Sequence, residues 1–213
     1  MSTKTWRGVT VEERREDQRT RLLVAGCEVF AARGYAGASV EDIVAGARVS
    51  RTAFYRLFEN KEECLLAVFW DAIAQLMEAI APILAAVDDP PEKRVYDGAR
   101  TLLERFAADP ALARVVLIEI VGATRAAEQA RTLARRRFAE ALAAQLGTTS
   151  LWEGAPEGEI ELVAFATMAG VAESIGYLVV TDRLDEWESA AEPLTRYALR
   201  ALAPGEPPED GWA

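Results

Sequence analysis

The sequence of 213 residues contains no histidine and only two cysteines. The missing histidine removes the commonest general base and the commonest zinc ligand. Cys27 and Cys64 each lie within an apolar pattern, which favours packed, reduced thiols over a disulfide framework. No nucleophile, metal-ligand set or glycine-rich phosphate loop stands out in the sequence. We therefore expect neither a catalytic site, nor a metal site, nor a cofactor.

Positive charge is scarce and unevenly distributed. The chain has 24 Lys and Arg against 34 Asp and Glu. Residues 1–60 contain ten basic and eight acidic residues, whereas residues 61–213 contain fourteen and twenty-six. An acidic surface does not coat nucleic acid or an anionic membrane. Only the N-terminal segment is suited to a polyanionic partner, and the two charge regimes suggest two functions.

Long apolar runs are also rare, and the segment from Leu162 to Val180 is the nearest to a membrane span. Glu173 and Ser174 interrupt this segment, and no basic cluster flanks it. Burial on two sides, against the chain's own core and a second chain, explains such a helix better. The first ten residues contain no long apolar run that could serve as a signal sequence, so we expect a cytoplasmic protein without a membrane partner.

Signals for β-strands are nearly absent, whereas alanine and leucine dominate and apolar residues recur at helical spacing. The sequence therefore predicts an all-α fold of about nine helices. Breaks at proline, glycine and aspartate separate the predicted helices, which cover residues 11–33, 40–47, 51–58, 61–87, 92–108, 111–121, 123–146, 159–181 and 185–202. Pro193 is expected to kink or divide the last of them.

Four parts follow from this pattern. We predict that they are a flexible arm (1–10), a helix-turn-helix DNA-binding domain (11–60), a helical ligand-binding and dimerisation domain (61–203) and a disordered acidic tail (204–213).

Three polar residues carry the cap signals of the N-terminal region. Ser39 precedes Asp42 by three residues, which is the spacing of a capping box, and Ser50 and Asn60 can cap the next two helices. Gly34 follows the first helix at the position where a helix commonly ends. Two short helices joined by a tight turn form a helix-turn-helix, whose second helix can enter a major groove.

The predicted helix-turn-helix has an inner and an outer set of side chains. The predicted inner set consists of Ile43, Ala47, Val49, Phe54 and Phe58. The predicted outer set consists of Arg51, Thr52, Ala53, Tyr55 and Arg56. Guanidinium groups suit guanine edges and phosphates, and an alanine methyl suits a thymine methyl. A solvated helix pair with ordinary surface charges is the alternative interpretation.

Lys61 strengthens the nucleic-acid interpretation, because a cation in the first turn of a helix is unfavourable against the helix dipole. A phosphate bound at this turn would remove that conflict.

The run "GYAGASVEDIVAGARVSRTAFYRLFENKEECL", Gly34 to Leu65, resembles the N-terminal DNA-binding domain of the TetR family of transcriptional regulators. The landmarks that carry the resemblance are Gly34, Ser39, Ile43, Ala47, Val49, Ser50, Tyr55, Phe58, Lys61 and Glu62. The resemblance covers residues 12–66 by motif. It implies a homodimer whose C-terminal domain binds a small molecule and whose last two long helices form the dimer bundle.

Three positions depart from the family pattern. Arg48 stands where the family usually has a turn glycine, Gly46 stands where a better helix former is common, and Thr52 with Ala53 replaces a frequent glycine followed by a hydroxyl residue. The preferred base sequence therefore does not follow from the resemblance. A non-glycine residue in a left-handed turn costs about 1 kcal/mol or more, so Arg48 implies either a reshaped turn or strain that a DNA contact offsets.

Three sets of site residues complete the prediction. The predicted DNA-binding residues are Ser39, Arg48, Ser50, Arg51, Thr52, Ala53, Tyr55, Arg56 and Lys61. The predicted ligand-pocket residues are Phe69, Trp70, Met77, Phe106, Glu119, Phe138, Phe165 and Met168, with Trp152 as a further aromatic candidate. The predicted dimer-interface residues are Val163, Gly170, Val171, Gly176, Tyr177, Trp187 and Leu194. Plain core packing is the alternative for each aromatic residue, and a salt bridge is the preferred alternative for Glu119.

These features favour a ligand-responsive transcriptional regulator that represses from a near-palindromic DNA operator and is released by a small, mainly apolar effector. A helical small-molecule-binding protein or enzyme without DNA function and a protein-interaction module are the other candidates.

Overall fold

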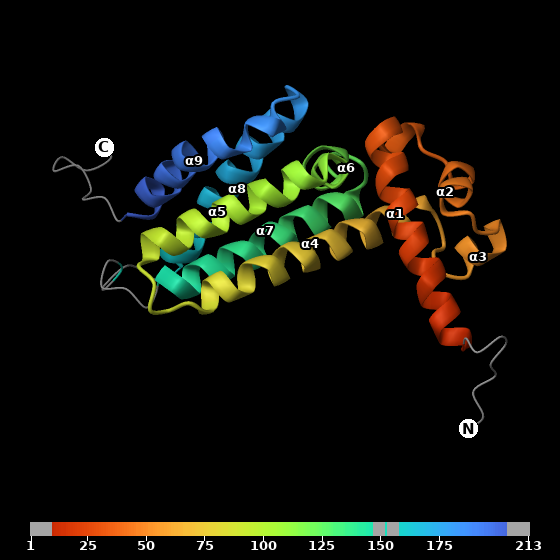
Figure 1. The fold of residues 1–213 in the computed structure, drawn as a ribbon, viewed down its shortest axis with the longest axis horizontal. Helices are drawn as coiled ribbons and strands as arrows, with labels where there is room; N and C mark the ends of the chain where they lie inside the picture. Colours follow the sequence, from red (N-terminus) through yellow and green to blue (C-terminus); the bar gives the residue numbers. More distant parts are fainter. Residues whose placement is uncertain (1–9, 147–151, 153–157, 204–213) are drawn as a thin grey trace. The chain divides into compact units, whose positions relative to one another are not determined.

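The computed structural model describes residues 10–146, 152 and 158–203 of the chain. Among these residues every regular element is helical, and the predicted all-α fold is confirmed (Figure 1). The elements are α1 (Val11–Gly37), α2 (Val40–Ala47), α3 (Arg51–Tyr55), α4 (Lys61–Ala85), α5 (Pro91–Ala108), α6 (Pro110–Arg114), the π-helix η1 (Val115–Glu119), α7 (Arg125–Leu146), α8 (Glu159–Val180), the 3-10 helix η3 (Leu184–Glu186) and α9 (Trp187–Leu202). The predicted arm, except Thr10, and the predicted tail lie outside the described residues.

Two of the predicted helices take a different form in the structure. The prediction extended the second short helix to Phe58, but α3 ends at Tyr55. The N–H groups of Leu57 and Phe58 both bond to the carbonyl of Phe54, at 2.8 and 2.9 Å, and the resulting turn buries Phe58. The predicted helix 111–121 is α6 followed by η1, where the N–H of Ile120 bonds to the carbonyl of Val115 at 3.1 Å. This five-residue bond is the mark of a π-turn.

The contacts divide the chain into two compact units, residues 1–74 with 109–131 and residues 75–108 with 132–213. This division differs from the predicted boundary at residues 60 and 61. The first part of α4 and the α6–η1 segment belong to the first unit, where α1 packs against α2, α6 and η1.

The first unit has a continuous apolar core. Its fully buried side chains are Leu22, Phe30, Ile43, Phe54, Leu65 and Phe69. Cys27 and Cys64 are free thiols within the same core, and burial raises the pKa of each to about 12. Thiols with such a pKa remain protonated and unreactive near neutral pH.

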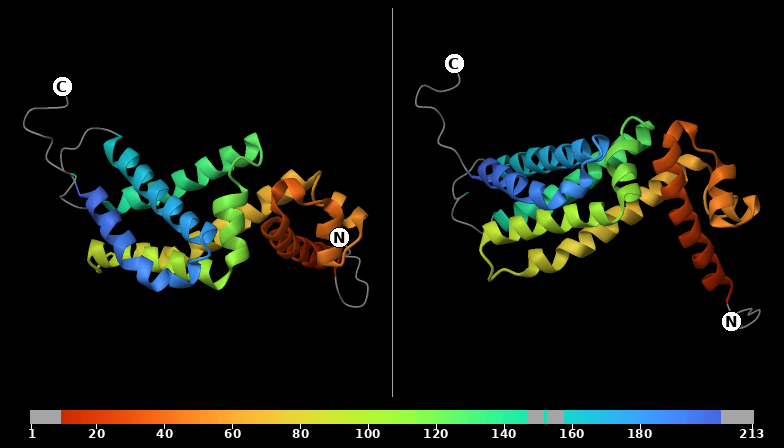
Figure 2. Two further views of the ribbon diagram at one scale, coloured as in Figure 1. Left: turned by 90° about the horizontal axis from the view of Figure 1, so that it is seen from above. Right: turned by 45° about the horizontal axis from the view of Figure 1, so that its top comes forward.

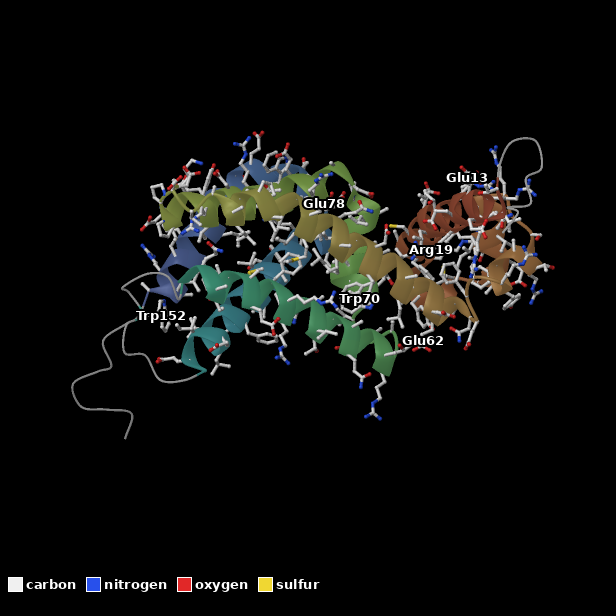
Figure 3. All side chains as sticks on the ribbon, turned by 90° about the horizontal axis from the view of Figure 1, so that it is seen from below. Glu13, Arg19, Glu62, Trp70, Glu78 and Trp152 are labelled. Atoms are coloured by element: carbon white, nitrogen blue, oxygen red, sulfur yellow. The ribbon has the colours of Figure 1, made fainter. Side chains whose placement is uncertain are left out.

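In the second unit α9 packs along α5 and against α8, as the views in Figures 1 and 2 show. Pro193 lies inside α9, which continues through it undivided. Trp152 is buried beside the C-terminal end of α9, and its indole N–H donates to the carbonyl of Leu202 at 3.1 Å (Figure 3).

Two helices, α4 and α8, are long and apolar enough to cross a membrane by length and composition alone, with mean hydropathies of 1.6 and 1.7. Their most apolar windows are 44% and 33% buried in the structure. Packing accounts for much of the apolar character of α4. The lower burial of α8 leaves large apolar side chains exposed, among them Leu162 and Val180.

Candidate nucleic-acid interface and ligand cavity

A complete capping box fixes the start of α2. The Ser39 hydroxyl accepts the N–H of Asp42 at 3.2 Å and donates to the Asp42 carboxylate at 2.6 Å. The same carboxylate accepts the N–H of Ser39 and pairs with Arg33 at 2.8 Å. The hydrogen bond from Ser39, together with the charge of Arg33, holds the pKa of Asp42 below its ordinary value. The hydroxyl of Ser39, which was predicted to contact DNA, therefore already serves the cap.

The turn after α2 is left-handed at Arg48, with φ 53° and ψ 44°. The Arg48 side chain is exposed. Gly46 is explained by packing rather than by the turn, since a Cβ atom there would lie 3.2 Å from the Cβ of Ala25 in α1. The glycine allows the close approach of α1 and α2, whereas the strained turn position carries an arginine.

The short α3 presents one polar face, which we call the α3 face, made of Arg51, Thr52, Tyr55 and Arg56. These four exposed residues line an open hollow of about 490 Å³. Ser50 caps the helix, since its hydroxyl accepts the N–H of Ala53 at 3.1 Å.

The predicted outward position of Ala53 is wrong. Its side chain is only 3% exposed and lies on the buried side of α3 with Phe54. A methyl group in this position cannot reach a thymine.

Arg51 is held over the α3 face by two partners. Its guanidinium pairs with Glu41 of α2 at 2.7 Å and donates to the Tyr55 hydroxyl at 3.4 Å. It also lies 5.6 Å from the centre of the Tyr55 ring. The hydrogen bond to Tyr55 and the charge of Glu41 raise the pKa of Arg51. Because both ion-pair partners are exposed, the pair orients Arg51 while contributing little stability.

Lys61 does not have the free ammonium group that was predicted to bind a phosphate. Its Nζ donates to the carbonyls of Tyr35, Ala36 and Ala38 at 2.8, 3.4 and 3.0 Å, and it lies 4.5 Å from the centre of the Tyr35 ring. These carbonyls belong to the end of α1, where the helix dipole favours a cation. The carbonyl groups at the end of α1 thus compensate the unfavourable position of the Lys61 cation at the start of α4.

Glu119 also meets the end of α1. Its carboxylate accepts the N–H of Tyr35 at 3.2 Å and pairs with Arg114 at 3.2 Å. Gly34 has φ 71° and ψ 163°, and a Cβ atom there would lie 3.1 Å from the Glu119 carboxylate. The salt-bridge alternative is confirmed, and the placement of Glu119 in an apolar pocket is wrong.

The second unit contains a cavity of about 80 Å³ between α4, α5, α7, α8 and α9. Of the predicted pocket residues, Phe138 and Met168 line it. Phe69 and Trp70 belong to the first unit, where their rings meet edge to face with centroids 5.4 Å apart. Aromatic residues dominate cores as well as pockets, so composition could not separate the two.

The remaining pocket predictions fall elsewhere. Phe106 is buried in the core, and Phe165 packs against the alanine cluster of Ala139, Ala143 and Ala164. Trp152 packs against Leu202. Met77 is half-buried and is not among the residues that line the cavity.

Two polar residues of the cavity were missed by the prediction. Thr167 is 1% exposed, and its hydroxyl donates to the carbonyl of Val163 at 2.8 Å. Arg94 is 8% exposed, and its Nη1 donates to the side-chain oxygen of Gln145. The sequence signal that could have found Arg94 is its position in the first turn of a predicted helix, like that of Lys61.

The residues predicted for the dimer interface separate into buried and exposed groups. Val171, which lines the cavity, and Gly176 are buried inside the second unit, so these two predictions are wrong. At Gly170 a Cβ atom would lie 2.4 Å from the hydroxyl of Tyr197, so this glycine permits the contact between α8 and α9 of one chain.

The other predicted interface residues reach the surface. Tyr177 is 59% exposed and lines an open groove of about 420 Å³ with Leu194. Val163 and Trp187 are half-buried.

Comparisons with known proteins agree with this geometry. The sequence model described as "Bacterial regulatory proteins, tetR family" matches residues 22–68, which include α2, the turn and α3. The chain is 34% identical over 86 residues to the HTH-type transcriptional repressor DhaR of Mycobacterium sp. (strain GP1), a match that covers 40% of this chain and 43% of DhaR. The chain spans about half or less of the length of the first curated relatives it matches.

Solved structures with the same fold cover most of the chain. The fatty acid degradation regulator FadR from Bacillus halodurans has a TM-score of 0.75 at 20% identity and covers 85% of this chain and 94% of its own. FadR from Bacillus subtilis, solved in complex with stearoyl-CoA, has a TM-score of 0.71 at 20% identity and covers 83% and 97%. At this identity the likeness concerns the fold. The family model thus identifies residues 22–68 as the DNA-binding domain of the tetR family of bacterial regulatory proteins, and most of the chain shares the fold of the solved regulators.

Proposed function

We propose that the protein is a ligand-responsive DNA-binding transcriptional regulator. The observation that carries this proposal is the α3 face, in which two arginines, a threonine and a tyrosine stand exposed on a helix capped by Ser50. These side chains supply guanidinium and hydroxyl donors of the kinds that contact base edges and phosphates in a major groove. Arg48 stands exposed in the turn that precedes α3 and is a further candidate for a phosphate contact.

The protein acts as a homodimer in this proposal. Leu162, Tyr177 and Val180 of α8 and Tyr197 of α9 are 45–69% exposed, and burial against a second copy would remove this apolar surface from water. Two copies would present one α3 each to successive major grooves of a near-palindromic operator, with half-site centres roughly 34–36 Å apart.

The proposed mode is repression that a small, mainly apolar effector relieves. Two observations support an apolar ligand. The second unit contains a cavity, and FadR from Bacillus subtilis, which has a similar fold, was crystallised with stearoyl-CoA. A ligand acts only through its different affinity for two states of the protein, so the cavity must be coupled to the spacing of the two α3 helices. We infer that α4 carries this coupling, because it begins at Lys61 beside the end of α1 and contributes Ile80 and Leu84 to the cavity.

A salt titration with mixed genomic DNA tests the proposal. A dimer that neutralises about six or more phosphates loses roughly a thousandfold or more in affinity between about 50 and 200 mM salt. The matched variants are Arg56→Ala, on the α3 face, and Arg136→Ala, which removes an exposed arginine paired with Glu140 in the second unit. We expect Arg56→Ala to reduce the salt slope and Arg136→Ala to leave it unchanged.

The cavity also favours the second candidate, a helical ligand-binding protein without DNA function. Absence of DNA binding even at low salt would reject the regulator and leave that candidate. A protein-interaction module would bind neither DNA nor a small molecule.

A further inference from the structure

We propose that the cavity of the second unit binds an aliphatic monocarboxylate, with the Arg94 guanidinium holding the carboxylate and the cavity walls holding the hydrocarbon chain. The identification of this ligand as the effector rests on the proposed function, whereas its binding does not depend on DNA.

The charge of Arg94 lacks a compensating partner among the described residues. The side chain is 8% exposed, yet its Nε–H has no hydrogen-bond partner within that part of the chain. Within the same part of the chain its Nη1 donates to the neutral side-chain amide of Gln145. Burial of a charge is strongly unfavourable unless the charge is paired and hydrogen-bonded. An anionic group beside Arg94 would supply both the opposite charge and the missing acceptor.

The position of Arg94 in its helix increases this imbalance. Arg94 lies in the first turn of α5, since its backbone N–H bonds to the carbonyl of Pro90 at 3.1 Å and the helix begins at Pro91. The positive end of the helix dipole and the buried guanidinium therefore repel each other, and both favour an anion. A carboxylate matches the planar fork of an arginine, because its two oxygens accept two parallel N–H bonds.

The remaining walls select a hydrocarbon chain. Apolar side chains make up most of the lining, including Ile80, Leu84, Leu102, Phe138, Met168 and Val171. Arg94 is the one charged residue among the described residues that line the cavity, and Thr167 already donates to a backbone carbonyl. The volume of about 80 Å³ is roughly half that of a cavity that holds benzene. It therefore admits about three non-hydrogen atoms as it stands, and a carboxylate with a hydrocarbon chain requires the walls to move.

The test compares carboxylates with uncharged molecules of the same length. Butanoate, hexanoate and octanoate are titrated into the full-length protein by calorimetry and thermal shift, against the corresponding primary alcohols, at constant ionic strength. We expect at least one acid to bind about 10- to 100-fold more tightly than its alcohol, because a charge-assisted hydrogen bond is absent from the alcohol complex.

Three variants assign the preference to Arg94. Arg94→Met removes the guanidinium and is expected to abolish the preference for the acid. Arg94→Lys keeps the charge without the planar fork and is expected to retain part of it. Arg100→Met removes an exposed arginine from the same helix and is expected to change nothing. Circular dichroism verifies that each variant is folded, and the comparison of acid with alcohol in the unmodified protein remains decisive if Arg94→Met does not fold.

Two results would overturn the proposal: no acid in the series binding more tightly than its alcohol, or a preference that survives in Arg94→Met. DNA binding is measured separately on the same samples. Carboxylate binding without DNA binding would reject the proposed regulator and support the carboxylate site. DNA binding without carboxylate binding would support the regulator and reject the carboxylate site.

Discussion

Lys61 and Arg94 occupy equivalent local positions in the two compact units and meet opposite surroundings. Each is a cation in the first turn of a long helix, α4 for Lys61 and α5 for Arg94, where the helix dipole is unfavourable. Lys61 donates to three carbonyls at the end of α1, whereas Arg94 donates to one neutral amide and keeps an unpartnered Nε–H among the described residues. The same anomaly in the sequence thus marks a structural cap in one unit and a proposed ligand site in the other.

The largest expected effect concerns stability at Lys61. Lys61→Met keeps the aliphatic stem but leaves the carbonyls of Tyr35 and Ala38 without their charged donor. We expect the free energy of unfolding to fall by about 2 to 3 kcal/mol, because hydrogen bonds to charged groups contribute more than neutral ones. Urea unfolding measures this loss. The control is Lys93→Met, which removes an exposed lysine paired with Asp89 and Asp97 and is expected to cost less than about 1 kcal/mol.

The salt dependence of DNA binding is the second measurement on Lys61→Met. If Lys61 serves only as a cap of α1, the salt dependence of DNA affinity is the same in Lys61→Met as in the unmodified protein. A shallower slope with unchanged stability would restore the phosphate contact that the sequence suggested.

Arg51 is a third cation in the first turn of a helix, here α3. Its partners Glu41 and Tyr55 are exposed, which distinguishes it from both Lys61 and Arg94. Arg51→Ala is expected to cost about 1 to 3 kcal/mol in binding free energy on the operator and little on random DNA, because a guanidinium that reads a base is lost. Competition binding on both DNAs measures the difference. Equal losses would make Arg51 a phosphate contact. Glu41→Gln is the matched variant, because it removes the ion pair at 2.7 Å and keeps the arginine.

Local signals predicted most of the helices and caps. The bounds of α2, its capping box, the Ser50 cap and the break at Gly34 are confirmed, because each depends on residues within a few positions of one another. The π-turn of η1 was missed because a run of apolar residues reads equally well as an α-helix.

Contacts between distant segments account for the errors in the site. The partners of Lys61 lie 23–26 residues away, and Glu119 reaches Tyr35 across 84 residues. Ala53 was placed outward because a small side chain gives little periodic signal, although α3 buries it beside Phe54. Apolar composition selected Phe138 and Met168 as pocket residues, but it selected residues of the plain core as well. It could not indicate Arg94, which is charged. The domain boundaries and the DNA contacts stay predictions.

Arg94→Met tests the surroundings of Arg94 in the ligand-free protein, for comparison with Lys61→Met. A methionine of similar length removes an uncompensated buried charge, so we expect the free energy of unfolding to stay constant or rise by about 1 kcal/mol. The sign is therefore opposite to that for Lys61→Met. Urea unfolding in ligand-free buffer measures it. A loss of about 2 kcal/mol or more would mean that Arg94 is a structural residue, like Lys61, and would remove its claim to a ligand.

Arg48 is expected to give the smallest effect, because its strain lies in the backbone rather than in an unpaired charge. A left-handed residue other than glycine costs about 1 to 2 kcal/mol, and glycine in turn loses about 0.5 to 1 kcal/mol of unfolded-state entropy. Arg48→Gly should therefore raise the free energy of unfolding by about 0.5 kcal/mol. Arg48→Asn is the matched variant, because asparagine tolerates the left-handed region and keeps a side chain without the charge. Lower DNA affinity in both variants would assign a phosphate contact to the guanidinium, whereas unchanged affinity would leave Arg48 as strain without a binding role.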